Sequence, residues 1–312
     1  MKQTNLTWCA ILVCTMLSCE KESMVTKPHS EIEAANSTVA EVLTTNPSNL
    51  LTGDFNGDGT TDILYTTSSQ WLISYGGTST WQQVTTSDMV AADIKIGDFN
   101  GDGLSDVLNG TGTYWRVSYG ANTSWQQVLT DTSTAQDWQI GDFNADGHSD
   151  VLIGTGTQWN VSYSAINPLV TIQTGNTTTA QDWRIGDFNG DGISDVLTGT
   201  GSVWKISYSA TTPWAQVITS SYGTDQLLVG DFNNDGHSDI LAGTGTQWMI
   251  SSGATSSWAI VKTSESSVAA DLKIGDFNND GYADVFYATG TQWQVSYNAN
   301  SPWTILRTTP EI

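Results

Sequence analysis

Residues 53–62 read Gly-Asp-Phe-Asn-Gly-Asp-Gly-Thr-Thr-Asp, and the interpretation of the whole sequence starts from this stretch. Its last nine residues follow the pattern D-x-N-x-D-G-x-x-D. The pattern begins six times, at starts 44 or 45 residues apart, namely at Asp54, Asp98, Asp142, Asp187, Asp231 and Asp276. A fixed period of this length is typical of proteins in which each repeat forms one small structural unit.

The polar residues of each copy occupy alternate positions of a short loop. In the first copy these are Asp54, Asn56 and Asp58, and Asp62 ends the pattern. Thr60 offers its backbone carbonyl. Ca²⁺ is a hard cation that takes about six to eight oxygen ligands from carboxylates, amides, backbone carbonyls and water. The loop therefore predicts a calcium site.

All six copies keep these positions, so we expect up to six bound Ca²⁺ ions. In the other copies the expected ligands are Asp98, Asn100, Asp102, Leu104 and Asp106; Asp142, Asn144, Asp146, His148 and Asp150; Asp187, Asn189, Asp191, Ile193 and Asp195; Asp231, Asn233, Asp235, His237 and Asp239; and Asp276, Asn278, Asp280, Tyr282 and Asp284. The seventh position varies freely, as expected if only its backbone carbonyl binds. The glutamate that closes an EF-hand loop at position twelve is absent. Acidic turns without metal are the alternative, but turns do not require three fixed aspartates.

Each repeat also predicts four short strands. In the third unit they fall at 137–140, 150–153, 159–163 and 169–172, separated by turns rich in Gly, Ser, Thr and Asn. Four short strands in about 44 residues are typical of one propeller blade. We therefore expect an all-β protein, a β-propeller of six four-stranded blades. Each blade would carry a calcium loop between its first and second strands.

The predicted propeller spans residues 49–307, and residues 308–312 form a tail. Seven blades are the alternative, because residues 38–43 faintly resemble the fourth strand of the repeat. Those residues would then pair with the edge of the domain.

The string Gly-Asp-Phe-Asn-Gly-Asp-Gly at 53–59, 97–103 and 186–192 resembles the FG-GAP/VCBS repeats. Such repeats build the calcium-bearing propellers of integrin α chains, certain fungal lectins and many bacterial surface proteins. The resemblance covers about five-sixths of the chain. It implies the same fold and the same metal. Integrin propellers have seven blades, and only some of those blades carry calcium. In this sequence all six units keep the complete loop pattern.

The formal net charge is −22, although only 13% of the residues are charged. Eighteen of the 32 acidic residues are predicted calcium ligands, three in each of six loops. Six Ca²⁺ ions would add twelve positive charges and leave about −10. We therefore expect metal binding and folding to be linked. With ten Lys and Arg and no basic run, nucleic acid and anionic membrane surfaces are not expected partners.

Residues 1–18 have the features of a secretion signal, with Lys2 followed by an apolar stretch from 6 to 17. The string Met16-Leu17-Ser18-Cys19 resembles the lipobox of bacterial lipoproteins. In that family the signal is cut before the cysteine, which is then lipidated. A plain signal peptide is the alternative.

Cysteine usage favours the lipid, because Cys9 and Cys14 would leave with the signal and Cys19 would have no disulfide partner. Residues 19–48 are rich in Ser, Thr, Glu and Asn and predict a flexible stalk after the lipidated cysteine. We expect a protein anchored by lipid in the bacterial cell envelope, at the outer membrane or cell surface. It would contact the membrane only through that anchor.

Most of the 14 tryptophans recur in register. One set opens the predicted third strand of each unit and consists of Trp71, Trp115, Trp159, Trp204, Trp248 and Trp293. A second set opens the predicted fourth strand and consists of Trp81, Trp125, Trp214, Trp258 and Trp303, with Leu169 in the third unit. Large rings fill the space between blades, and we favour that role for the first set. The second set is the candidate for ligand contact.

These features predict a non-catalytic, extracellular recognition protein. A glycan is the preferred ligand, because repeated aromatic sites suit weak sugar binding strengthened by avidity. The alternative is adhesion or assembly with a surface protein, as the integrin resemblance implies. A polysaccharide-active enzyme is less favoured and no catalytic residue is predicted. His148 and His237 stand at the backbone-ligand position, and acidic residues outside the loops form no evident pair.

Overall fold

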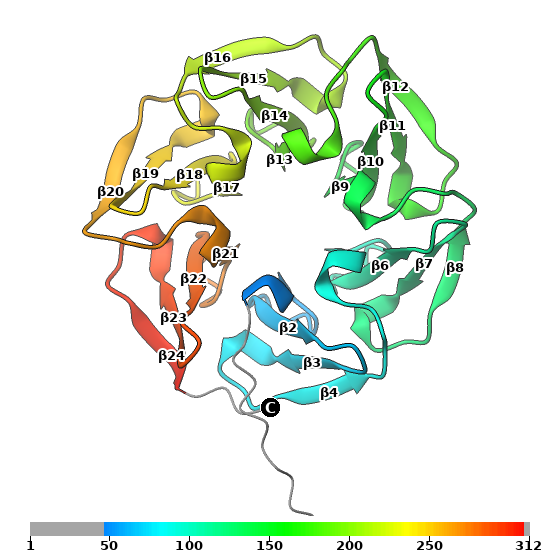
Figure 1. The fold of residues 1–312 in the computed structure, drawn as a ribbon, viewed down its shortest axis with the longest axis horizontal. Helices are drawn as coiled ribbons and strands as arrows, with labels where there is room; N and C mark the ends of the chain where they lie inside the picture. The colour runs from blue at the N-terminus through cyan, green and yellow to red at the C-terminus, as the bar shows by residue number, and fades with distance from the viewer. Residues whose placement is uncertain (1–46, 309–312) are drawn as a thin grey trace, which may run out of the picture. The chain divides into compact units, whose positions relative to one another are not determined.

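The structure, a computed structural model, describes residues 47–308 and contains six antiparallel four-stranded sheets arranged as blades in a ring (Figure 1). Each blade is made of four strands that are consecutive in the sequence. The first strand lies nearest the centre of the ring and the fourth lies at its rim. The prediction of an all-β propeller with six blades is confirmed, and the alternative of seven blades is wrong for the described residues.

The first three blades comprise residues 50–174. Blade 1 consists of β1 (Leu50–Gly53), β2 (Asp62–Thr66), β3 (Trp71–Ser74) and β4 (Gln82–Thr85); blade 2 of β5 (Ile94–Gly97), β6 (Asp106–Gly110), β7 (Trp115–Ser118) and β8 (Gln126–Leu129); and blade 3 of β9 (Trp138–Gly141), β10 (Asp150–Gly154), β11 (Gln158–Ser162) and β12 (Val170–Thr174).

The last three blades comprise residues 184–308. Blade 4 consists of β13 (Arg184–Gly186), β14 (Asp195–Gly199), β15 (Val203–Ser207) and β16 (Ala215–Thr219); blade 5 of β17 (Leu227–Gly230), β18 (Asp239–Gly243), β19 (Gln247–Ser251) and β20 (Ala259–Thr263); and blade 6 of β21 (Leu272–Gly275), β22 (Asp284–Ala288), β23 (Gln292–Ser296) and β24 (Thr304–Thr308).

Short 3₁₀ helices fall into two sets. One set follows the third strand of each blade and consists of η2 (Tyr75–Gly77), η4 (Tyr119–Ala121), η6 (Tyr163–Ala165), η8 (Tyr208–Ala210), η10 (Ser252–Ala254) and η12 (Tyr297–Ala299). The other precedes the first strand and consists of η1 (Pro47–Asn49), η3 (Ala91–Asp93), η5 (Ala135–Asp137), η7 (Ala180–Asp182), η9 (Thr224–Gln226) and η11 (Ala269–Asp271). None of the helices in residues 47–308 is long and apolar enough to cross a membrane.

Burial in each blade follows the position of the strand in the ring. All five residues of β2 are buried, because neighbouring blades cover both of its faces. The outermost strand β4 has two exposed residues followed by two half-buried ones. The core therefore consists of clusters between adjacent blades, and each cluster draws residues from two sheets.

The six tryptophans that open the third strands are fully buried in these clusters. Trp71 and Trp115 begin β3 and β7, and the others occupy the equivalent positions. This agrees with the core role that we favoured for them.

The ring closes between blades 6 and 1 without a strand shared between them, since within residues 47–308 every sheet is built from one continuous segment. Hydrogen bonds join the two blades instead. The backbone N–H of Thr61 donates to the carbonyl of Asp276 at 2.6 Å, and Arg307 Nη1 donates to the carbonyl of Ser79 at 2.8 Å.

Several predictions concern residues outside 47–308 and so lie outside the described structure. They are the signal at 1–18, the lipidated Cys19, the possible strand at 38–43, nearly all of the stalk at 19–48, and the tail after residue 308.

Candidate functional site

The predicted calcium ligands lie in the loop that joins the first and second strands of each blade. In blade 1, Asp54 Oδ1 accepts a hydrogen bond from the Gly57 N–H at 2.7 Å, and Oδ2 accepts one from the Gly59 N–H at 2.9 Å. Asp58 Oδ1 accepts the Thr60 N–H at 2.8 Å. Gly59 has a φ of 83°, a left-handed conformation that favours glycine at the sixth position. The loop amides therefore hold the carboxylates inside the turn.

The aspartate that ends each loop is fully buried. Asp62 Oδ2 accepts the Phe55 N–H at 2.8 Å, and Oδ1 accepts the Gly76 N–H at 2.8 Å. This carboxylate therefore joins the loop to the turn after the third strand. The same two contacts recur in every blade, through Asp106, Asp150, Asp195, Asp239 and Asp284.

Burial raises the pKa of Asp62 to about 6, although its two amide donors oppose the shift. The charges of Asp54 and Asp58 raise it further. Burial also raises the pKa of the equivalent aspartate to about 6 in the other five blades. Each loop thus concentrates negative charge around a buried carboxyl group.

The donor set of each loop fits Ca²⁺ in type and charge, because it offers three carboxylates, one side-chain amide and one backbone carbonyl. No group of three His, Cys, Asp or Glu side chains in residues 47–308 is arranged to hold a metal ion. The carboxylates instead accept hydrogen bonds from amides, as Asp54 and Asp62 do. The chemistry of the loop therefore suits the ion, and its occupancy stays a prediction.

Neighbouring loops are hydrogen-bonded to one another around the whole ring. The Ser105 N–H donates to the Asp54 carbonyl at 2.6 Å, and the Asp54 N–H donates to Ser105 Oγ at 3.0 Å. The equivalent backbone bonds join Ser149 to Asp98, Ser194 to Asp142, Ser238 to Asp187, Ala283 to Asp231 and Thr61 to Asp276. We did not predict these links. The sequence feature that could have indicated these links is the Ser or Thr at the eighth position of five of the six loops.

The seventh side chain of a loop packs on the preceding loop. A Cβ atom on Gly101 would lie only 2.3 Å from His148 Nε2, and one on Gly190 would lie 2.5 Å from His237 Nε2. His148 Nδ1 also lies 3.3 Å from Ser164 Oγ. The variable side chain at this position therefore contributes to contacts between blades, a role that its variability did not predict.

The five tryptophans proposed as ligand contacts are half-buried and lie just before the fourth strands. Each packs edge to face against a third-strand tryptophan of a neighbouring blade. The pairs, with the distances between ring centroids, are Trp125 with Trp71 at 5.4 Å, Trp81 with Trp293 at 5.1 Å, Trp214 with Trp159 at 5.3 Å, Trp258 with Trp204 at 5.1 Å, and Trp303 with Trp248 at 5.3 Å. Leu169 packs in the equivalent cluster beside Trp115. These rings are therefore part of the packing between blades, with one side partly accessible.

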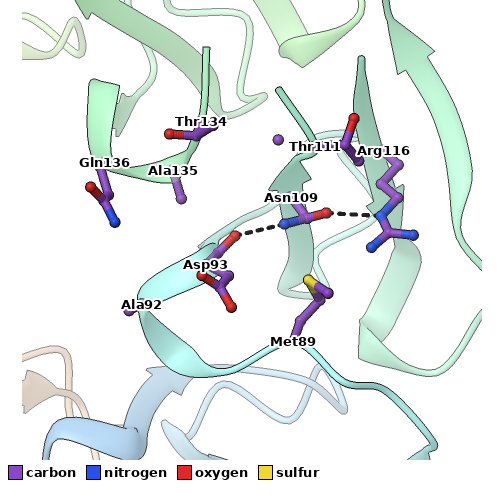
Figure 2. A pocket seen from close by; sticks show the side chains of 10 residues that line it. Met89, Ala92, Asp93, Asn109, Thr111, Arg116, Thr134, Ala135 and Gln136 are labelled. Carbon is purple, nitrogen blue, oxygen red and sulfur yellow. Dashed lines mark hydrogen bonds between the residues drawn. The ribbon is translucent and has the colours of Figure 1, made fainter. Parts of the chain in front are cut away.

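Figure 2 shows a pocket of about 420 Å³ next to blade 2, lined by that blade and by the segments that join it to blades 1 and 3. Asn109 Nδ2 donates to the Asp93 carbonyl at 2.8 Å, and Arg116 Nε donates to Asn109 Oδ1 at 2.8 Å. The Arg116 guanidinium carbon lies 4.5 Å from the centre of the Trp125 ring. A cation, a carboxylate, two amides and two threonine hydroxyls thus line one pocket.

A second pocket, of about 470 Å³, lies beside blade 4 and overlaps only in part with the position of the first, because its lining includes the end of β12 and the turn that ends at Trp214. Lys205 takes the position of Arg116. Trp214 takes that of Trp125, and its Nε1 donates to Asn176 Oδ1 at 3.2 Å. We did not predict either pocket, because the cation occurs in only two of the six repeats and leaves no periodic signal.

Comparison with known proteins supports the fold and the repeat. A family model of the FG-GAP-like repeat matches residues 54–109 and 187–242. No curated protein sequence matches the chain.

Among solved structures, a lectin from Agrocybe aegerita that specifically recognises non-reducing terminal N-acetylglucosamine is similar, with a TM-score of 0.59 and 15% identity. The match covers 84% of this chain and 80% of the lectin. The Tc holotoxin pore of Photorhabdus luminescens has a TM-score of 0.56 and 16% identity. That match covers 82% of this chain but only 14% of the toxin chain.

At these identities the similarity to solved structures shows the fold alone. The residues that match the family model include the loops of blades 1, 2, 4 and 5, and every blade has the same strand order. Two segments of the chain therefore match the FG-GAP-like repeat, and they lie in a six-bladed β-propeller.

Proposed function

We propose that this chain is a calcium-stabilised, non-catalytic recognition protein that binds carbohydrate outside the cell. The observation that carries the proposal is a pair of pockets beside blades 2 and 4 that place Arg116 and Lys205, which occupy the same position of the repeat, in their linings. Threonine hydroxyls, side-chain amides and a cation line both pockets, and these groups suit the dense hydroxyls of a sugar. Two such pockets on one ring would bind a polysaccharide more tightly than either pocket alone.

The cations favour a sugar that carries a carboxylate. In the described residues, Arg116 uses Nε for Asn109 and forms no ion pair, so its terminal N–H groups remain for a ligand. Lys205 lines the other pocket and likewise has no carboxylate partner among residues 47–308. Hydrogen bonds between ionised groups are about twice as strong as neutral ones. A uronic acid unit therefore fits the pocket of Lys205 better than a neutral sugar does, whereas Asp93 also lines the pocket of Arg116 and offsets its charge.

Calcium, when bound, would supply positive charge to each loop. The residues that would hold it in blade 1 are Asp54, Asn56, Asp58, Asp62 and the carbonyl of Thr60. The hydrogen bonds between consecutive loops would transmit that stabilisation around the ring. The pockets would then be held in a fixed arrangement for the ligand.

The test is binding of the full-length protein, with calcium, to an array of neutral and uronic-acid oligosaccharides. We expect binding to acidic members, and we expect the double variant R116M/K205M to bind them about tenfold or more weakly. The matched control is Lys262→Met, which removes a cation that lines neither pocket.

Two results would overturn the proposal. One is the absence of binding to every oligosaccharide on the array. The other is unchanged affinity in a folded double variant. A partner protein that remains bound in excess sugar would replace carbohydrate recognition with adhesion.

A further inference from the structure

Three of the seven basic residues in residues 47–308 occupy the same position on the first strands of their blades. They are Lys95 on β5, Arg184 on β13 and Lys273 on β21. These strands belong to blades 2, 4 and 6, which alternate around the ring (Figure 1). The same position in blades 1, 3 and 5 is occupied by Leu51, Gln139 and Leu228. A chain of net charge −22 therefore places three cations in threefold order on its innermost strands.

A cavity of about 400 Å³ lies between these innermost strands. Its lining comes from the first strands of five blades and includes Arg184, Lys273, Gln139 and Thr52. Lys95 lies on the first strand of the remaining blade. Burial lowers the pKa of Lys95, and the positive charge of Arg184 lowers it further. We call this cavity the central channel.

None of the three cations has an ion-pair partner among residues 47–308. No carboxylate oxygen of residues 47–308 lies within 4.0 Å of any of them. Arg184 donates from Nε to the Leu227 carbonyl at 2.8 Å and from Nη1 to the Trp183 carbonyl at 2.9 Å, so neutral groups orient it. The negative charge of the exposed Asp225 raises the pKa of Arg184, but Asp225 forms no ion pair with it.

Burial also lowers the pKa of Arg184, of Lys95 and of Lys273. Partly desolvated cations disfavour the fold unless an anion pairs with them, and the like charges of Lys95 and Arg184 add to that cost. Packing does not require charge at this position, because blades 1 and 5 place leucine there. The cations therefore need an explanation other than fold stability.

We propose that the central channel binds a tetrahedral oxyanion, a phosphate or sulfate group, between Lys95, Arg184 and Lys273. Cations from three alternate blades can each face a different oxygen of such a group, and Arg and Lys both bind it by charge-assisted hydrogen bonds. Gln139 and Thr52 add polar groups to the lining. The channel has room for more than one ion, so the group is either a free anion or the end of a sulfated or phosphorylated sugar. This site is separate from the two polar pockets and does not depend on their ligand.

The test is titration calorimetry of the full-length, calcium-loaded protein with sodium sulfate at constant ionic strength, because sulfate stays soluble with calcium. We expect saturable binding. Each of the variants K95M, R184M and K273M should bind sulfate about tenfold or more weakly. Lys273→Arg keeps the charge and should retain binding. Lys205→Met, which alters a cation of the polar pocket, should leave sulfate affinity unchanged.

A second titration, with glucosamine 6-sulfate, identifies the source of the group. Tighter binding than sulfate indicates a sulfated sugar, and weaker binding indicates the free anion. Crystals of the unaltered protein soaked in selenate should show an anomalous peak between the three cations, a result that does not depend on the folding of any variant.

The proposal is overturned if sulfate produces no saturable heat, if K273M binds sulfate as tightly as the unaltered protein does, or if the selenate peak lies elsewhere. Loss of sugar binding in R116M/K205M with sulfate affinity intact would separate this site from the proposed carbohydrate pockets.

Discussion

At the scale of the residue, the aspartate that ends each loop differs sharply from the other acidic ligands. Asp150 is fully buried, and its carboxylate accepts the Phe143 N–H at 2.8 Å and the Ser164 N–H at 2.7 Å. Asp146 stands in the same loop but is exposed. The buried carboxylate therefore accepts the hydrogen bonds that join the loop to the turn after the third strand. It is also one of the predicted calcium ligands.

Replacing this acceptor should destabilise the fold. In Asp150→Asn, the new amide NH₂ faces an N–H donor, so one buried donor loses its partner. We expect the free energy of unfolding to fall by about 2–3 kcal/mol. Urea denaturation with calcium present measures the change. The control is Asp88→Asn, an exposed position, which should change stability by less than about 0.5 kcal/mol. Equal stability of both variants would contradict the structural role.

At the scale of the element, tryptophans at regular positions of the repeat pack adjacent blades against each other. The tryptophan of each third strand is buried, and in five of the six contacts between neighbouring blades it meets a fourth-strand tryptophan. Leu169 fills the place of the second ring in the remaining contact. The outer partner thus tolerates an aliphatic side chain, whereas the inner ring is tryptophan in all six blades.

This difference predicts unequal effects of substitution. Trp204→Ala empties a fully buried site and should lower the free energy of unfolding by about 3–5 kcal/mol. Trp258→Leu copies the arrangement found in blade 3 and should cost about 1–2 kcal/mol. Urea denaturation of both variants checks the order. If Trp258→Leu lowered the free energy of unfolding more than Trp204→Ala did, the outer ring would contribute more to stability than its partial burial indicates.

At the scale of the whole ring, closure depends on contacts between complete blades. No strand passes from one sheet to the next in residues 47–308, so the loops with their backbone links and the packed tryptophans join the blades. The loops also carry most of the negative charge. Six calcium ions would reduce the formal charge from −22 to about −10, which would relieve repulsion between carboxylates around the ring.

Removal of calcium should therefore lower the melting temperature. In excess chelator we expect a decrease of about 5–10 °C, restored by added calcium and not by the same concentration of magnesium, which prefers a smaller octahedral site. Scanning calorimetry of the full-length protein measures the change. An identical melting curve with and without chelator would contradict a structural role for calcium.

The fold could be predicted because its signals are periodic. The loop pattern fixes where each hairpin turns. The apolar run at 150–153 and the alternation at 159–163 predict strands that the structure places at Asp150–Gly154 and Gln158–Ser162. The pockets and the central channel could not be predicted in this way. Arg116 and Lys205 occur in two repeats only, and Lys95 gives no local sign that it lies near Arg184.

The sequence by itself determined the repeat, its six units, the four strands of each unit and the oxygen donors in each loop, whereas the structure of residues 47–308 decided between six and seven blades. The strands and the loop of each blade depend on residues within about 44 positions of one another, so the pattern of a single repeat is enough to predict them. Only the tertiary structure decided which side chains face one another across the ring. It buries one tryptophan of each pair, forms a pocket beside two blades, and places cations on the innermost strands of blades 2, 4 and 6, two of which line one channel. The physical reason is that closing the ring brings together residues far apart in the sequence, and their proximity leaves no trace in any single repeat.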